Sequence, residues 1–349
     1  MKKHGRIVEL DALRGLAIIL VCLFHFSMMY PKSFLPLALF KYGATGVDLF
    51  FMISGFVIFM SIEGSNNVKK FWLLRFNRLF PAYWLSIIIA VVVILFLNHG
   101  NIVTNWKFII GNLFMIQPAL NTPSLVDAYW TLYVELSFYF LISSIWFFGW
   151  INKIEGIIWM GLFLMLLING LYVLTGTKSA VFLRFFIASR ALIPMLSYFC
   201  FFASGIIYSK IYQYGWTTNR LLLLIICFIM TALIHNISGR FNLFFGTIER
   251  LFCVAIFNIL FILFVNGKAA FLNIRWLLYA GAISYALYLV HESFGLSLTM
   301  ALCNKINLSL AIILGILASL VLSALITVLF EKPIQRWLKK VQSKVKNYN

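Results

Sequence analysis

The sequence predicts an all-α polytopic membrane protein with about ten transmembrane helices and both termini in the cytoplasm. The first supporting observation is composition, because 63% of the 349 residues are hydrophobic and 11% are charged, which is outside the range of soluble domains. The second is the set of apolar stretches, which are long enough to cross a hydrocarbon core of about 30 Å. The third is the uneven distribution of Lys and Arg between alternate loops.

Ten stretches satisfy the length requirement for a membrane span. They lie at residues 8–30, 45–62, 79–98, 128–150, 156–175, 193–212, 219–236, 248–266, 277–301 and 308–330. The stretch 108–116 is too short to cross, so we expect a re-entrant or interfacial segment there. We expect one membrane domain over residues 1–335, followed by a basic cytoplasmic tail over residues 336–349. The five cysteines show no close pairing, so neither a disulfide framework nor a metal site is predicted.

The basic residues indicate the orientation of these spans. With the N-terminus inside, the cytoplasmic segments carry about twice as many Lys and Arg residues as the external ones, as the positive-inside rule requires. The formal charge of +18 is therefore read as an orientation signal and as attraction to anionic membrane lipid. Nucleic acid is not an expected partner.

The first span carries a polar stripe along one side. At 100° per residue, Asp11, Arg14, Cys22 and His25 share a helix face, and Arg14 lies about 17 Å below His25 along the axis. Ionisable residues within the membrane are costly and are usually functional. The alternative is an Asp11–Arg14 ion pair, with a hydrogen-bonded histidine that stabilises helix packing.

A second basic feature follows the second span. The segment "KKFWLLRFNRLFPAYW" places Arg75 and Arg78 three residues apart in a predicted loop, with Pro81 at the expected start of the third span. Such a pair either extends toward lipid phosphate or forms a clamp for a phosphorylated ligand.

Two further predicted spans bury ionisable groups. The fourth contains Glu135, and a carboxylate there must be paired, protonated or hydrated. The ninth carries a polar series whose alternative explanation is hydrogen bonding between helices, comprising Ser284, Tyr285, Tyr288, His291 and Glu292. Counting 1.5 Å per residue places His25, Glu135 and His291 in one layer of the outer half. Arg14, Arg75, Arg78 and Glu331 then lie near the inner face.

The segment "GATGVDLFFMISGF" in the second span permits two interpretations. Its glycines Gly43, Gly46 and Gly55 allow close helix packing, or Asp48 near its outer end binds sugar hydroxyls. Trp130, about one turn before Glu135 on the outer side, is our candidate for stacking on a sugar ring.

Several of these segments, in this order, resemble the acyltransferase family 3 membrane proteins. They are "DALRGLAIILVCLFHF", "GATGVDLFFMISGFVIF", "RFNRLFPAYW", "YWTLYVELSFYF", "ISYALYLVHE" and a closing "FEKP". The resemblance implies a multi-pass protein of the bacterial inner membrane. It also implies O-acylation, most often O-acetylation, of a carbohydrate such as a surface polysaccharide, lipopolysaccharide or peptidoglycan, with cytoplasmic acyl-coenzyme A (acetyl-coenzyme A) as the donor.

By that resemblance, Arg14 and His25 match the family's essential pair, and Arg75 and Arg78 match its donor-side motif. We expect His25 to be the general base, and Glu135 to orient its imidazole or compensate its charge. Arg14 is expected to meet the donor's phosphates or its thioester carbonyl. The expected substrate-binding residues are Asp48, Trp130, Tyr288 and His291.

Two other classes of protein remain open. A transporter or flippase of a lipid-linked sugar also needs polar groups at the membrane midplane, but it explains the two arginines poorly. A membrane acyltransferase that modifies a lipid or a protein would place its catalytic histidine late in the chain, where His291 lies.

Overall fold

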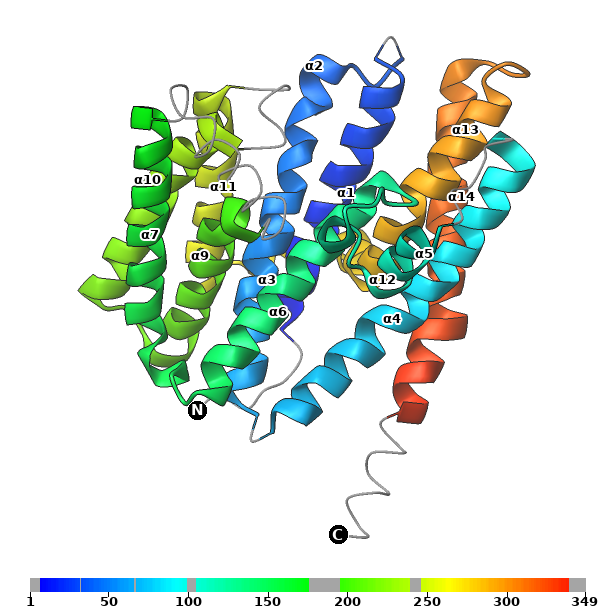
Figure 1. Cartoon of the computed structure of the whole chain (residues 1–349). Coiled ribbons are helices and arrows are strands. Elements are labelled where there is room, and N and C mark those ends of the chain that lie inside the picture. Colours follow the sequence, from blue (N-terminus) through cyan, green and yellow to red (C-terminus); the bar gives the residue numbers. More distant parts are fainter. Residues whose placement is uncertain are drawn as a thin grey trace, which may run out of the picture. The chain divides into compact units, whose positions relative to one another are not determined.

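The computed structural model describes residues 7–31, 33–65, 67–98, 105–175, 195–238 and 246–338, and these residues form helices with no strand (Figure 1). Most of the N-terminal segment and of the predicted tail, which carry part of the basic charge, lie outside them. The α-helices are α1 (Val8–Met29), α2 (Leu37–Phe40), α3 (Gly46–Glu63), α4 (Val68–Val93), α5 (Trp106–Phe114), α6 (Trp130–Phe147), α7 (Ile154–Thr175), α9 (Met195–Tyr214), α10 (Thr218–Ser238), α11 (Thr247–Val265), α12 (Arg275–Val290), α13 (Ser297–Leu302) and α14 (Leu308–Ile326).

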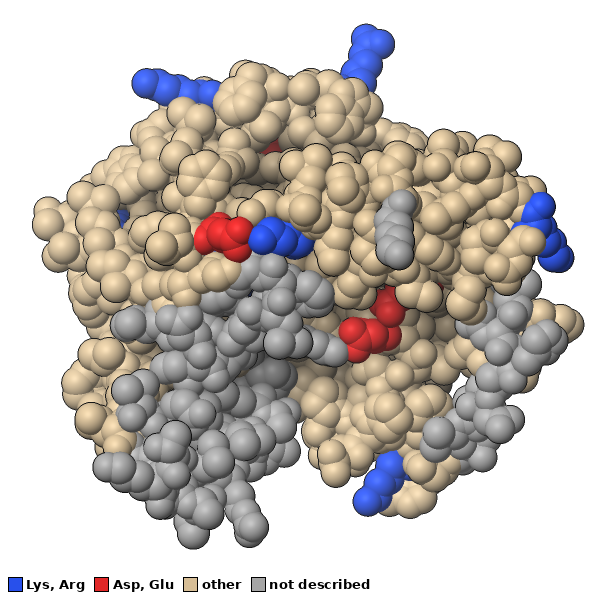
Figure 2. Space-filling model, turned by 90° about the horizontal axis from the view of Figure 1, so that it is seen from above, with Lys and Arg blue, Asp and Glu red and all other residues tan. Residues whose placement is uncertain are grey.

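Seven helical segments in the described part of the chain are long and apolar enough to cross a membrane. They are Val8–Met29, Leu37–Glu63, Val68–Phe96, Asp127–Phe147, Ile151–Leu171, Thr247–Val265 and Leu308–Leu338. This agrees with a polytopic membrane protein, whereas the count of ten and the side of the termini stay predictions. Helix α5 has nine residues, about 14 Å in length, which fits the expected short segment. The face shown in Figure 2 is mostly uncharged, and its few charged side chains among the described residues include an acidic and a basic group side by side.

The predicted start of the third span is wrong. Helix α4 begins at Val68 and contains Pro81, so the arginines expected on a loop lie on a helix. A proline removes one backbone donor and normally ends a helix, but within membranes neighbouring groups compensate the freed carbonyls. The carbonyl that loses its donor to Pro81 is that of Asn77, four residues earlier. Nearby, the Leu79 carbonyl accepts a hydrogen bond from the Tyr285 hydroxyl at 2.8 Å.

The predicted ninth span is also interrupted. Helix α12 ends at Val290, and the π-helical segment η7 (His291–Leu296) connects it to α13. A π-helical turn widens the backbone and changes the direction of the side chains that follow, and such turns are frequent at functional sites. Two further π-helical segments, η2 (Ile94–Asn98) and η8 (Thr327–Glu331), follow α4 and α14 respectively.

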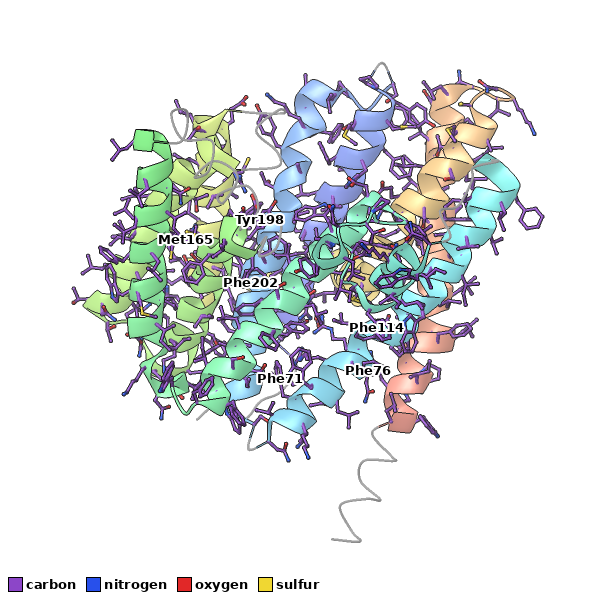
Figure 3. The ribbon with its side chains drawn as sticks, in the orientation of Figure 1. Phe71, Phe76, Phe114, Met165, Tyr198 and Phe202 are labelled. Carbon is purple, nitrogen blue, oxygen red and sulfur yellow. The ribbon has the colours of Figure 1, made fainter. Side chains whose placement is uncertain are left out.

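The chain divides into two compact units. One comprises Met1–Phe24, Leu39–Ser65 and Thr131–Gly281, and the other comprises His25–Ala38, Asn66–Trp130 and Ala282–Asn349. In the first unit α3 packs along α9, and α9 contacts α7, α10 and α11. Figure 3 labels Tyr198 and Phe202 of α9. The centroids of their rings lie 4.8 and 4.9 Å from that of Phe51 on α3.

Glycines allow close helix contacts in the first unit, as predicted for Gly43, Gly46 and Gly55. A Cβ atom at Gly43 or Gly46 would collide with the backbone of α1, and one at Gly55 would collide with Phe202 of α9. Small residues let helix backbones approach closely where lipid supplies no hydrophobic driving force. The packing interpretation of this segment is therefore confirmed.

In the second unit α4 contacts the π-helical segments η7 and η8, and α14 packs against η7 and α13. Gly295 of η7 and Gly315 of α14 lie at a close contact, where a Cβ atom at Gly295 would collide with the Ser319 hydroxyl and one at Gly315 with the Thr299 hydroxyl. Their neighbours, Ser319 and Thr299, donate hydrogen bonds to the backbone carbonyls of Gly315 and Gly295 at 2.8 and 2.9 Å. This contact holds the wide turn of η7 against a regular helix.

In the first unit the buried Asp48 of α3 forms an ion pair with the buried Arg250 of α11, at 2.9 Å, and this pair can be tested. We expect Arg250→Ala to lower the free energy of unfolding by about 3–5 kcal/mol, because it leaves a buried carboxylate uncompensated. The double variant Asp48→Leu/Arg250→Met, which removes both charges, should recover most of that loss. Thermal unfolding in detergent measures both. Equal stability of Arg250→Ala and the parent protein would contradict a structural role for the pair.

Candidate functional site

The two histidines predicted to share a layer are in contact. His25, near the end of α1, and His291, the first residue of η7, both belong to the second unit. The Nε2 atom of His291 lies 3.4 Å from Nδ1 of His25, and the rings meet edge to face with centroids 4.9 Å apart. We call these residues the histidine pair. It joins groups that are 266 positions apart in the sequence.

The members of the histidine pair differ in exposure. The side chain of His291 is completely buried, and its Nδ1 atom lies 2.8 Å from the Tyr288 carbonyl and 3.2 Å from the Leu287 carbonyl. His25 is half-buried. Of the two, His25 is therefore the one that a bound molecule can reach more readily.

An acidic residue that the sequence analysis did not assign lies beside the pair. Glu292 follows His291 in η7 and is close enough to His25 to interact with it electrostatically. Its Oε2 atom accepts a hydrogen bond from the Ala128 backbone at 2.8 Å. The sequence could have pointed to Glu292 as a site residue only through its position directly after a histidine in a predicted span.

The predicted substrate contact of Tyr288 has a different explanation in the structure. Its hydroxyl is buried and donates to the Ala128 carbonyl at 3.0 Å. Tyr288 and Glu292 therefore hold the N–H and the C=O of one residue, just before the half-buried Trp130 begins α6. This arrangement fixes the 127–129 turn against α12 and η7.

The two arginines of α4 also belong to the second unit. Arg75 is buried, and its guanidinium lies 5.5 Å from the centroid of the Phe71 ring. Arg78 is half-buried and lies close enough to Glu331 to interact electrostatically, which agrees with the predicted grouping of these charges. A buried arginine is a poor fit to the lipid-phosphate alternative, which needs the charged group at the membrane surface.

The remaining predicted site residues lie in the first unit. Arg14 donates to Asp11 at 3.0 Å, so the ion pair considered for the first span is present. Glu135 accepts hydrogen bonds from the hydroxyls of Ser54 at 2.9 Å and Tyr139 at 2.6 Å, which supplies the partners that an intramembrane carboxylate requires. The role expected for Glu135, to orient the His25 imidazole or compensate its charge, stays a prediction.

Asp48 is completely buried and is paired with Arg250 of α11 through contacts of 2.9, 3.0 and 3.2 Å. Both carboxylate oxygens take part, in the bidentate geometry that makes such pairs strong. This environment favours a structural role, joining α3 to α11, over a sugar contact. We leave Asp48 out of the proposed site on that ground.

Comparison with known proteins identifies related sequences. Residues 7–328 match the family described as acyltransferase domain. The chain is 30% identical to the peptidoglycan O-acetyltransferase OatA of Listeria monocytogenes, over 38% of this chain and 23% of the relative. It is 28% identical to the putative acetyltransferase ORF330 of Acidianus two-tailed virus, over 50% of this chain and 51% of the relative. The chain spans about half the length of these relatives or less. No solved structure matches it.

The Ala128 contacts generate a test of Tyr288. We expect Tyr288→Phe to lower the free energy of unfolding by about 1 kcal/mol, because the Ala128 carbonyl loses a buried donor. Tyr279→Phe is the matched control, since that side chain lies exposed on the same helix; it should leave stability unchanged. Thermal unfolding of both variants in detergent provides the measurement. Unchanged stability of Tyr288→Phe would show that the hydrogen bond is not structural.

Proposed function

The chain belongs to the acyltransferase domain family, and from that premise we propose that it is a membrane O-acyltransferase. In this proposal an acyl group, normally acetyl, passes from acyl-coenzyme A to a hydroxyl group of a carbohydrate. The observation that carries the proposal is the histidine pair, which places a half-buried imidazole of α1 next to a fully buried one of η7. Acyl transfer to a hydroxyl needs a base near neutral pH, and a neutral imidazole suits that requirement.

In the proposed reaction one proton moves from the acceptor hydroxyl through His25 to the sulfur of the donor. His25 takes the proton of the acceptor hydroxyl while the hydroxyl oxygen attacks the thioester carbonyl carbon. The bond from this carbon to sulfur then breaks, and the proton held by His25 passes to the departing sulfur to give the free thiol. His25 returns to its neutral form. Glu292, which interacts electrostatically with His25, stabilises the positive charge that this residue carries between the two proton transfers.

The arginines of α4 are the groups that we assign to the donor. Nucleotide phosphates are best held by planar guanidinium groups, which form two parallel hydrogen bonds. Arg75 and Arg78 are three residues apart on one helix, so their side chains lie on neighbouring positions of one face. For Arg14, which belongs to the first unit, a role at the donor's phosphates or its thioester carbonyl stays a prediction.

The chemical class of the acceptor is inferred from the related proteins. One relative is named a peptidoglycan O-acetyltransferase, and this supports a carbohydrate hydroxyl of the cell surface, free or lipid-linked, as the acceptor. The apolar helices support a multi-pass location, which we propose to be the bacterial inner membrane. Trp130, half-buried at the start of α6, remains our candidate for stacking on the sugar ring.

Loss of the base tests the proposal directly. His25→Ala should reduce kcat by about 10²- to 10⁴-fold while leaving the folded yield unchanged. The assay supplies labelled acetyl-coenzyme A and a peptidoglycan or polysaccharide acceptor to the purified protein and follows both thiol release and acceptor labelling. A transporter would not consume the thioester. Near-normal acceptor labelling by this variant would exclude His25 as the base.

The donor arginines are tested by affinity. We expect Arg75→Ala and Arg78→Ala each to weaken acetyl-coenzyme A binding by about 10- to 100-fold, because a hydrogen bond to a charged group contributes about 1.5–3 kcal/mol. Arg→Lys should recover only part of this loss. Lys70→Ala, at an exposed position of the same helix, is the control for charge alone. Unchanged donor affinity in both arginine variants would exclude the assignment.

A further inference from the structure

We propose that His291 is a positioning residue that holds His25 in a single tautomer, with the proton on Nδ1 and the lone pair on Nε2. The inference concerns the protonation state of the histidine pair and rests on the proposed function only for what that lone pair does. It replaces the expected substrate contact of His291, because the ring is completely buried and both of its nitrogens face protein groups.

The first step concerns the proton on His291. Its Nδ1 atom lies 2.8 Å from the Tyr288 carbonyl and 3.2 Å from the Leu287 carbonyl. A carbonyl oxygen can only accept a hydrogen bond. The Nδ1 atom of His291 must therefore carry a proton and donate it to the turn of α12 that precedes it.

The second step concerns the charge of His291. A fully buried imidazolium needs a compensating partner, since an uncompensated charge in an apolar interior is far more costly than a neutral hydrogen-bonded ring. The groups that face its two nitrogens are carbonyl oxygens and another imidazole. We therefore assign His291 as neutral, which leaves a lone pair on Nε2 because a neutral imidazole carries one proton.

The third step transfers this assignment to His25. Its Nδ1 atom is the one that faces Nε2 of His291, at 3.4 Å. Two lone pairs cannot form a hydrogen bond, so Nδ1 of His25 carries the proton and donates. A contact of this length is consistent with a catalytic hydrogen bond that tightens when substrate binds. The lone pair of neutral His25 is then on Nε2.

The surroundings make this arrangement rigid. His291 begins a π-helical turn that is held by the Gly295–Gly315 contact with α14. Phe26, which follows His25 in α1, packs against the same two glycines. The two histidines are thus anchored through neighbouring residues to one closely packed region. A second group that fixes the tautomer of a working histidine is a recurrent device, because the wrong tautomer presents a proton where a lone pair is needed.

The consequence is a division of work between the two residues. His25 is the residue that exchanges protons with substrate, and His291 acts through it without touching substrate. When His25 becomes positively charged, its Nδ1 proton still points at a neutral acceptor, and the nearby Glu292 carboxylate offsets the charge. One buried chain therefore runs from the Tyr288 carbonyl through His291 to His25.

The tautomer can be measured without turnover. Protein labelled with ¹⁵N-histidine and reconstituted in nanodiscs gives separate signals for nitrogens that carry a proton and those that carry a lone pair. The chain has five histidines, and His25→Gln identifies the His25 signals. We expect a protonated Nδ1 and an unprotonated Nε2 on neutral His25. A protonated Nε2 on this residue would overturn the proposal, whatever the activity of the enzyme.

Two variants of His291 separate positioning from folding. His291→Phe keeps a ring but removes the acceptor, so the His25 tautomers should mix and kcat should fall about tenfold or more, with KM for acetyl-coenzyme A unchanged. His291→Gln restores an amide oxygen near the Nε2 position and should recover the tautomer and part of kcat. If the Phe variant does not fold, the parent and Gln spectra decide the question. An unaltered His25 spectrum in a folded Phe variant would overturn the proposal.

Tyr83→Phe is the matched structural control. It removes two buried hydrogen bonds of the same unit, one donated by the Tyr83 hydroxyl to the Asn112 carbonyl at 2.5 Å and one accepted from the Gln117 amide at 3.3 Å. This variant should reduce stability without changing the His25 signals. Failure of the proposed function has a different signature. In that case His25→Ala retains acyl transfer, while the parent spectrum still shows the Nδ1-protonated tautomer.

Discussion

The organisation of this protein depends on one constraint, which is that polar groups placed within hydrocarbon must find their partners inside the protein. Each unit meets it with the groups available nearby. In the first unit the buried Asp48 carboxylate is joined by the Arg250 guanidinium, and the half-buried Glu135 carboxylate accepts hydrogen bonds from two hydroxyls. In the second unit, backbone carbonyls and a neighbouring imidazole face both nitrogens of His291. The same partners that make burial tolerable also restrict what each group can do chemically.

Close backbone packing makes these partnerships possible. Hydrogen bonds need distances near 3 Å, and helices separated by large side chains cannot bring short polar groups that close. Glycines supply the missing space, between α3 and α9 at Gly55 and Gly205 and between η7 and α14 at Gly295 and Gly315. At the second contact the serine and threonine hydroxyls bond back to their own helices, so a polar surface can pack without unsatisfied donors. Small residues therefore serve the polar network as much as the packing.

The histidine pair shows how a structural requirement can become a chemical one. A single histidine at the end of α1 could adopt either tautomer, and each would present a different group to a bound molecule. Contact with a second, fully buried histidine removes that choice, because the carbonyls of α12 determine the proton position on His291. The irregular π-helical turn is where this occurs. A regular continuation of α12 would direct the following side chains differently, and the residues from His291 to Leu296 would then lose their present partners.

Much of the architecture was accessible from local sequence signals. Apolar length predicted helices that agree with α1, α3, α6, α7, α10 and α11 to within a few residues, because a membrane span is specified by its own composition. The polar stripe of α1 and the packing role of Gly43 and Gly46 were likewise readable, since helical periodicity places them without knowledge of any partner. The start of α4 could not be predicted from local sequence signals. A proline such as Pro81 normally ends a helix in water, but within a membrane it is tolerated where neighbouring groups satisfy the freed backbone groups.

Local sequence patterns were sufficient to predict the membrane environment, the approximate helices and the candidate proton-handling residues, because each depends on residues close together in the chain. The contacts that those residues make follow from the way the helices pack. The tertiary structure paired Asp48 with an arginine 202 positions away, gave Tyr288 a backbone partner, placed Glu292 beside His25 and buried His291 against the same residue. Partner choice at such separations depends on how helices pack, and packing is set by shape complementarity among many side chains at once. No local pattern along one helix carries that information.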